Sequence, residues 1–206
     1  MRRTSPVVAS VVLVVAALAL AACNGDDGTS ASTDAATTND PDASVPPVDA
    51  PPVVGEPPRL AGTTDAHNAA RAAVGVGPLT WDPQLAAIAQ AWAQQCIDRE
   101  APAGLIDHNA NRSNGYPTYV GENIYGAGGS ATGTDAVRLW VSEQAHYHHD
   151  TNSCDPGAIC GHYTQVVWRG TTKVGCAVYD CPGLTYGSSV VCDYGPGGNI
   201  GGQAPY

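Results

Sequence analysis

The 206-residue chain is predicted to contain one α+β domain in which helices lie on an antiparallel sheet. The prediction depends on a change of hydrophobic period along the chain. Apolar residues first recur at helical spacing, as in Leu85, Ile88, Ala89 and Trp92. From Cys160 onward, apolar residues alternate with a period of two, and turns rich in Gly and Pro separate the runs. Helices followed by paired strands are typical of an α+β fold.

Three helices are expected before residue 150. The first begins at Thr63 or Thr64, because either hydroxyl can cap a helix N-terminus, and it ends at Gly75. The third begins at Thr134 or Asp135 for the same reason. Both segments carry an apolar stripe at helical spacing, which predicts that one face of each helix is buried.

The second helix has the strongest start signal. Asp82 can accept hydrogen bonds as an N-cap, and Pro83 suits the first helical position. The apolar face that follows ends near Cys96, which is expected to point inward from the last turn of this helix.

Strands are expected mainly in the C-terminal part. Residues 163–168, 174–179 and 188–194 alternate in polarity, and a shorter piece covers 120–125. The segment 163–168 is interpreted as a central strand that places His162 at its start.

The net charge of −10 is unevenly distributed along the chain. Residues 24–58 hold seven acidic residues and no basic ones, whereas residues 59–206 hold twelve acidic and seven basic residues. A nucleic-acid partner requires clustered Lys and Arg, so this charge distribution argues against one.

The N-terminus has the features of an export signal. Arg2 and Arg3 precede an apolar run over residues 7–20, which is shorter than a membrane-spanning helix requires. The sequence Leu-Ala-Ala before Cys23 resembles a bacterial lipobox, which predicts a lipoprotein signal over residues 1–22 and lipidation of Cys23. The alternative is an ordinary secretory signal in which the cysteine occurs by chance.

Residues 23–58 are predicted to be a disordered, acidic and Pro-rich tether. The stretch consists largely of Asp, Thr, Ser, Ala and Pro and has too few large apolar side chains to form a core. Its proline pairs favour extended chain. The globular domain is therefore assigned to residues 59–206.

The cysteine count agrees with export. The chain has seven cysteines, and if Cys23 carries lipid, six remain. An even number in an exported protein predicts three disulfides, although spacing alone does not choose among the pairings. A structural zinc site is a weak alternative, because the spacings lack paired short gaps.

Several short motifs resemble the signature segments of the CAP superfamily, which comprises cysteine-rich secretory proteins, antigen 5 and pathogenesis-related 1 proteins. The segments are GHYTQVVW at 161–168, Val174-Gly175-Cys176, His67-Asn68-Ala69-Ala70-Arg71, Pro78-Leu79-Thr80-Trp81-Asp82, Gly121-Glu122-Asn123, Trp140-Val141-Ser142-Glu143, Gly198-Asn199 and Pro205-Tyr206. They occur in family order over about residues 60–206, and the resemblance is greatest to the plant pathogenesis-related branch.

The resemblance implies a three-layer α-β-α sandwich with a mainly antiparallel central sheet. It also implies the disulfides Cys96–Cys181, Cys154–Cys160 and Cys176–Cys192. Such bridges would tie the second helix to the sheet, close a short loop and join two neighbouring strands.

The resemblance further implies two His and two Glu residues facing one cleft. Carried onto this sequence, they are His108, Glu122, Glu143 and His162. His108 and His162 could hold a divalent cation such as zinc, with the carboxylates orienting the imidazoles. The alternative is a hydrogen-bonded His–Glu network that shapes the cleft walls without turnover.

The four remaining histidines are also possible ligands. His146, His148 and His149 with Asp150 form a candidate metal tract, although a solvated helix end is the preferred interpretation. His67 is interpreted as a packed or capping residue rather than a ligand.

The sequence therefore predicts an exported, membrane-tethered and monomeric CAP-domain protein that acts as a binding or interaction module. An enzyme is not favoured, because no serine or cysteine stands in a nucleophile setting. Two alternatives are a metal-assisted, peptidase-like hydrolase that uses Glu122 or Glu143, and a sterol- or lipid-binding protein of the kind that the family includes.

Overall fold

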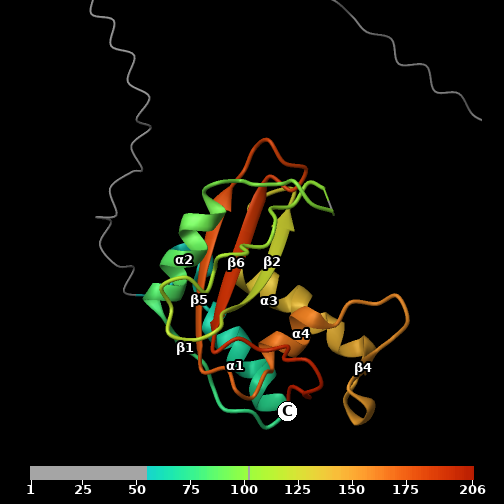
Figure 1. Ribbon diagram of the computed structural model, residues 1–206. Helices are drawn as coiled ribbons and strands as arrows, with labels where there is room; N and C mark the ends of the chain where they lie inside the picture. Colours follow the sequence, from blue (N-terminus) through green and yellow to red (C-terminus); the bar gives the residue numbers. More distant parts are fainter. Residues whose placement is uncertain (1–54, 102) are drawn as a thin grey trace, which may run out of the picture. The chain divides into compact units, whose positions relative to one another are not determined.

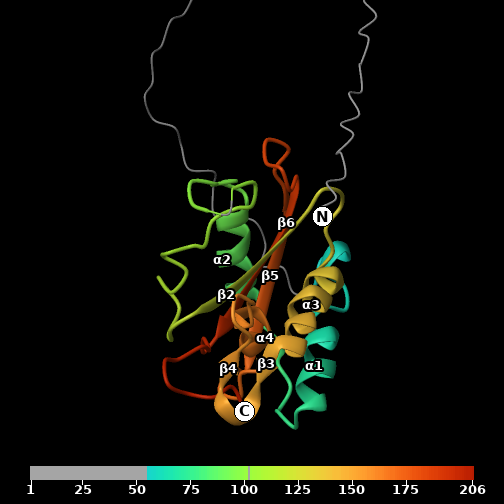
Figure 2. The same cartoon turned by 90° about the vertical axis from the view of Figure 1, so that its right-hand side faces the viewer.

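A four-stranded sheet separates two helical layers in the computed structural model, as Figures 1 and 2 show from two directions. The structure describes residues 55–101 and 103–206. The predicted signal over 1–22, Cys23 and the tether up to residue 54 lie outside the described residues. Among the described residues, no helix combines the length and apolar character needed to cross a membrane.

The three helices expected before residue 150 are present, whereas the part of the chain after Cys160 begins with a further helix. Short 3-10 helices precede and separate these elements. In chain order, the elements are η1 (Pro58–Leu60), α1 (Thr63–Ala73), β1 (Thr80–Trp81), α2 (Pro83–Ala93), β2 (Gly121–Ala127), α3 (Gly133–Ser142), η2 (Glu143–His146), β3 (Tyr147–His148), η3 (His149–Thr151), β4 (Ser153–Cys154), α4 (Gly161–Val166), β5 (Lys173–Asp180) and β6 (Ser188–Gly195).

The sheet has the strand order β1-β5-β6-β2. The pairs β5–β6 and β6–β2 are antiparallel, and the two-residue strand β1 runs parallel to β5. Helix α2 packs on β5 and β6, whereas α3 and α4 contact β2 from the other side, and α1 packs on α3 and α4. The fold class is therefore confirmed as a mixed α+β sandwich of three layers.

All residues of β6 are buried. Side chains on its two faces belong to two different apolar clusters. Val190 and Tyr194 join the cluster that includes Trp140 of α3. Val191 joins the cluster beneath α2 that includes Ala89. Because side chains alternate along a strand, Asp193 lies on the same face as Val191.

The prediction of a strand over 163–168 is wrong, because this segment contains helix α4. The β-branched and aromatic residues favour a strand locally. However, Tyr163, Val166 and Val167 also have the i, i+3, i+4 spacing of a helix face, and all three are buried. Gln165 is buried as well, and its side chain accepts a hydrogen bond from the backbone of Gly198. Burial on several sides therefore overrides the local β preference.

Two helix starts differ from the predictions. At α1, neither Thr63 nor Thr64 provides a cap: the N-cap is Gly62, and the carboxylate of Glu56 accepts from the backbone N–H groups of Gly62 and Thr64, at 2.6 Å each. At α3, the cap is Thr132, whose hydroxyl accepts from the N–H of residue 135. The predicted cap of α2 is confirmed, because Asp82 accepts from the backbone of residues 84 and 85.

Cys96 also departs from its predicted place. It lies beyond the end of α2, in a left-handed conformation with a φ of 48°, rather than in the last turn of the helix. Its disulfide partner is Cys181, which directly follows β5.

The described chain contains three disulfides, which are the three pairs that the family resemblance implies. They are Cys96–Cys181, Cys154–Cys160 and Cys176–Cys192. The first ties the segment after α2 to the end of β5. The second closes the short loop that precedes α4, and the third joins opposite residues of β5 and β6.

Two buried polar side chains of α1 connect this helix to the rest of the domain. The Nδ1 of His67 lies 2.8 Å from the carbonyl of Thr63, and its Nε2 lies 2.9 Å from the hydroxyl of Tyr194. Arg71 donates to the carbonyls of Val166 and Trp168 among others. The interpretation of His67 as a packed residue agrees with these contacts.

We expect His67 to make the domain less stable as the pH falls from about 6.5 to about 4. Burial lowers the pKa of His67 to about 4, so in this range the unfolded chain binds a proton that the folded chain does not. The loss should reach roughly 2–3 kcal/mol near pH 4.5. Urea unfolding of wild type and His67→Gln at several pH values measures it, and identical pH dependence in both proteins would contradict the prediction.

We also expect the disulfides to contribute unequally to stability. The Cys96–Cys181 bridge spans 85 residues, whereas Cys154–Cys160 spans 6. In the chain-entropy model, replacing the first pair with alanines costs about 4–5 kcal/mol and replacing the second about 2–2.5 kcal/mol. Urea unfolding of the two double variants, each with the other bridges intact, compares them. Equal losses would show that loop length does not govern their contribution.

Candidate functional site

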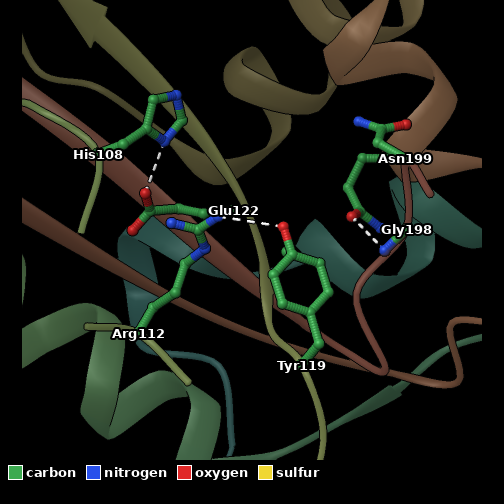
Figure 3. A pocket seen from close by; sticks show the side chains of 8 residues that line it. His108, Arg112, Tyr119, Glu122, Gly198 and Asn199 are labelled. Carbon is green, nitrogen blue, oxygen red and sulfur yellow. Dashed lines mark hydrogen bonds and ion pairs between the residues drawn. The ribbon is translucent and has the colours of Figure 1, made fainter. Parts of the chain in front are cut away.

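His108 and Glu122 form the first of two His–Glu pairs. The Nδ1 of His108 donates to Oε1 of Glu122 at 2.6 Å, and the backbone N–H of Asn109 donates to the same oxygen at 2.9 Å. The side chain of Glu122 is 0% exposed, whereas that of His108 is 57% exposed. Glu122 thus anchors an imidazole whose Nε2 remains available to a ligand (Figure 3).

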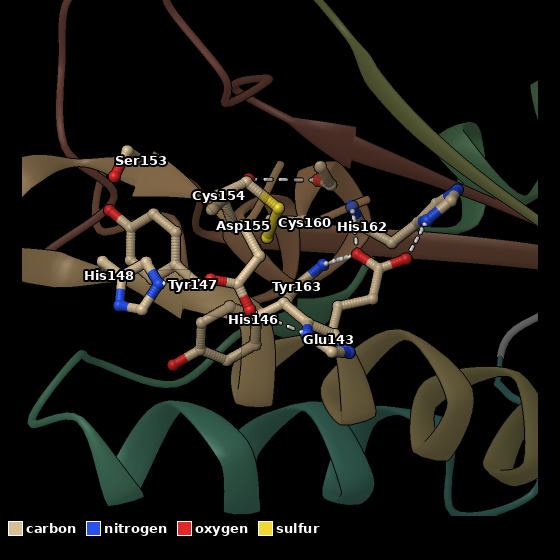
Figure 4. Close-up of a disulfide and its surroundings, with 12 residues drawn as sticks. Glu143, His146, Tyr147, His148, Ser153, Cys154, Asp155, Cys160, His162 and Tyr163 are labelled. Atoms are coloured by element: carbon tan, nitrogen blue, oxygen red, sulfur yellow. Dashed lines mark hydrogen bonds and ion pairs between the residues drawn. A yellow bond between two sulfur atoms is a disulfide. The ribbon is translucent and has the colours of Figure 1, made fainter. Parts of the chain in front are cut away.

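Glu143 and His162 form the second pair at the start of α4 (Figure 4). The Nδ1 of His162 donates to Oε1 of Glu143 at 2.5 Å. Oε2 of the same carboxylate accepts from the backbone N–H groups of His162 and Tyr163, at 3.0 and 3.1 Å. Glu143 therefore satisfies the first amides of α4 and orients the imidazole at once. The ring of His162 also stacks on Trp140, with centroids 6.3 Å apart.

Edge strand β2 lies between the two pairs. Glu122 and Asn123 are consecutive, so their side chains point to opposite faces of the strand. Glu122 binds His108 on one face, whereas Asn123 donates to the carbonyl of His162 and to the hydroxyl of Tyr194, at 3.1 Å each, on the other. The four predicted residues thus form two pairs attached to one strand, and their opening into a single cleft stays a prediction.

A cavity of about 350 Å³ lies beside the first pair (Figure 3). Its lining is mostly polar and comprises His108, Arg112, Tyr119, Gly121, Glu122, Gln165, Gly198 and Asn199. Glu143 and His162 are not among the lining residues. A Cβ at Gly121 would overlap the side chain of Gln165, which explains why glycine precedes Glu122.

Three lining residues escaped prediction from the sequence. Arg112 and Tyr119 lie in the loop over 100–120, which has no periodic pattern, and Gln165 lies in the segment predicted to be a strand. Arg112 donates to the carbonyls of Val120 and Asn109 at 2.8 Å each, so it also shapes the loop that carries His108. The sequence feature that could have indicated Arg112 is that it is the single arginine between residues 100 and 120.

The described residues contain no preformed metal site that would match the predicted divalent cation. Among residues 55–101 and 103–206, no three His, Cys, Asp or Glu side chains are arranged so that they could hold a metal ion. In both His108 and His162, Nδ1 is hydrogen-bonded to a carboxylate. A cation bound by either residue would therefore have to use its Nε2. A divalent cation on these residues stays a prediction.

The histidines after α3 are exposed, and Figure 4 shows His146 and His148 beside Asp155. His146 and His148 bind the two carboxylate oxygens of Asp155, at 3.1 and 2.6 Å. These hydrogen bonds, from His148 first and then His146, lower the pKa of the Asp155 carboxyl. His149 stacks on Tyr206, with ring centroids 4.5 Å apart, and Asp150 is exposed. The exposure of these side chains agrees with the predicted solvated helix end.

The comparisons with known proteins show the family. Residues 64–194 match the model of the cysteine-rich secretory protein family, CAP. The chain is 46% identical over 143 residues to the pathogenesis-related protein PR-1 type of Sambucus nigra, which covers 69% of this chain and 78% of that protein. It is 48% identical over 143 residues to pathogenesis-related protein 1C of Nicotiana tabacum, with coverage of 69% and 77%.

A solved structure supports the same fold. Venom allergen-like protein 4 of Schistosoma mansoni aligns with a TM-score of 0.58 and 24% identity, over 73% of this chain and 94% of that protein. This likeness concerns the fold alone, whereas the family match and the plant relatives concern the sequence. The chain belongs to the cysteine-rich secretory protein (CAP) family.

Proposed function

We propose that this CAP protein is an exported, membrane-tethered binding module whose ligand occupies the cavity beside His108 and Glu122. The cavity itself is the observation that carries the proposal. It combines an exposed imidazole, a guanidinium group and an aromatic ring that is 52% exposed at Tyr119. Such a mixture suits a ligand with several polar groups and one apolar face.

The hydrogen bonds of the two carboxylates favour binding over hydrolysis. Both oxygens of Glu143 accept hydrogen bonds from an imidazole or backbone amides. Oε1 of Glu122 is bound in the same way, and Oε2 is buried. A general base needs a carboxylate oxygen within reach of the attacking water, so these oxygens are better suited to orient the imidazoles.

The hydrolase therefore remains the second candidate. It would require the Nε2 atoms of His108 and His162 to hold a zinc ion and one Glu to move. A sterol or lipid ligand, which the family resemblance implies, would require an apolar surface outside this polar cavity.

Export and tethering are supported by independent features of the chain. The signal-like segment over 1–22 ends at Cys23, and the domain carries three disulfides, which are typical of oxidising compartments. The domain belongs to the cysteine-rich secretory protein family, and its plant relatives are pathogenesis-related proteins. We propose that a monomeric domain is displayed at the cell envelope on an acidic tether, and that it does not bind nucleic acid.

We expect two substitutions in the cavity to weaken ligand binding. His108→Ala and Tyr119→Ala should each weaken binding at least about tenfold, or about 1.4 kcal/mol, for a ligand captured from envelope glycans and lipids by the intact protein. His148→Ala and Tyr186→Ala are matched controls, because both are exposed and neither lines the cavity. Isothermal titration measures the affinities.

Equal affinity in all four variants would place the ligand elsewhere and contradict the proposed site. Cleavage of the captured ligand in the presence of zinc, abolished in Glu122→Gln or Glu143→Gln, would support the hydrolase instead.

We expect Cys23→Ser to abolish attachment of lipid to the protein. The substitution removes the thiol that would carry the lipid. Exporting cells supplied with a labelled fatty acid should then label wild type and the control Asn24→Ala but not Cys23→Ser. Equal labelling of Cys23→Ser and wild type, or no labelling of wild type, would contradict lipid tethering through Cys23.

A further inference from the structure

Asp193 is a buried carboxyl group for which the described residues provide no hydrogen-bond partner. The residue is 0% exposed, and both Oδ atoms lack a donor. It lies on the central strand β6, on the face that α2 covers. An ionised carboxylate in such a place would cost several kcal/mol unless it were paired.

The residue opposite Asp193 is also acidic. In the antiparallel pair β2–β6, Glu122 stands directly across from Asp193. Side chains of opposite residues point to the same face, with Cβ atoms roughly 5 Å apart. Oε2 of Glu122 is buried and has no partner among the described residues. Two carboxyl groups, with three unpartnered oxygens, therefore lie on the same face of neighbouring strands under the candidate site.

The surrounding charges do not neutralise both carboxylates. Arg112 is the cation that acts on Asp193, and its nitrogens already donate to Val120, Asn109 and Tyr119. At the start of α2, the carboxylate of Asp82 is occupied by Lys173, at 2.9 Å, and by the hydroxyl of Tyr116, at 3.2 Å. His108, which is also close to this region, uses its Nδ1 for Glu122.

Helix α2 also limits access of water to this region. Gly175 of β5 is the other neighbour of Asp193 in the sheet. A Cβ at Gly175 would overlap the backbone of Asp82 and Ala86, so the helix backbone lies directly on the sheet here. A low dielectric surrounds Asp193 as a result, and its repulsion by the charge of Glu122 is stronger than it would be in water.

We propose that Asp193 is protonated at neutral pH and donates a hydrogen bond to Oε2 of Glu122, and that it thereby acts as a positioning residue for the Glu122–His108 pair. One proton then satisfies two of the unpartnered oxygens and leaves a single negative charge. Two carboxyl groups that share a site commonly behave in this way. Burial first, and the charge of Glu122 second, raise the pKa of Asp193 well above its usual range.

The consequence for the site is a fixed orientation of Glu122. The hydrogen bond from Asp193 fixes Oε2 of Glu122. Oε1 of Glu122 is then directed at Nδ1 of His108, and Nε2 of the His108 ring faces away from the Glu122 carboxylate. This inference goes beyond the proposed function, because it concerns the unliganded protein and its test needs no ligand.

The test compares wild type with Asp193→Asn over about pH 5 to 9. Asparagine has the shape of a neutral aspartic acid, can donate from its amide to Oε2 of Glu122, and does not titrate. In wild type, the unfolded chain releases the proton of residue 193 near pH 4, whereas the folded chain keeps it. The unfolding equilibrium constant of wild type, divided by that of Asp193→Asn, should therefore rise about tenfold per pH unit until the pKa of Asp193 is reached.

Taking this ratio cancels the contribution of His67, which is common to both proteins. A ratio that does not change with pH would mean that Asp193 is already ionised in the folded protein and would overturn the proposal.

Carbon-13 NMR of aspartate carboxyl groups in the wild type gives a second readout, and it does not depend on how the variant folds. The resonance that is missing in Asp193→Asn should have the shift of a protonated acid at pH 7, and the shift of a carboxylate would overturn the proposal.

Asp193→Leu tests the positioning role, because leucine is of similar size but donates no hydrogen bond. The slowly exchanging Nδ1 proton of His108 should be visible in wild type and in Asp193→Asn and be lost in Asp193→Leu. The same signal in all three proteins would show that Asp193 does not position the pair.

Discussion

The short helix α4 is held at both ends by charged side chains, and the rest of the site depends on this constraint. Glu143 accepts from the first backbone amides of the helix, next to His162. Arg71 donates to the carbonyls of Val166 and Trp168 where the helix ends. A helix of six residues is too short to be stable alone, so these contacts and its buried face define where it begins and ends.

The edge strand β2 connects this helix to the opposite layer. Asn123 of β2 reaches the carbonyl of His162 on one face, and Glu122 holds His108 on the other. An edge strand has free space beside it, so side chains from both helical layers can approach it. The disulfide Cys154–Cys160 closes the loop that leads into α4, which limits how far His162 can move.

The polar groups of the site are mostly used within the protein, and this shapes its chemistry. Carboxylates that already accept two or three hydrogen bonds are suited to fix the direction of an imidazole. The atoms left for a ligand are the Nε2 atoms of His108 and His162, together with the side chains that line the cavity. A protonated Asp193 beneath Glu122 would extend the same principle into the core, because each buried acid would then have a partner.

Much of the fold could be predicted from local patterns. The three helices before residue 150, the cap at Asp82 and the approximate spans of β5 and β6 follow from periodicity and capping chemistry. The motifs around Glu122 and His162 led to the family and to the residues that form the two His–Glu pairs. These features depend on residues that are close in sequence or on motifs that the family shares.

Other features were decided by contacts between distant parts of the chain. The segment over 163–168 has side chains that suit a strand, and only burial among α1, α3 and the sheet makes it a helix. Glu56 caps α1 from a preceding stretch whose composition gave no sign of it. The residue opposite Asp193 could not be known before the register of β2 and β6, because a shift of one residue would turn Glu122 to the other face. The sequence by itself thus determined which elements form and which family they belong to, whereas the tertiary structure decided which acids and imidazoles meet.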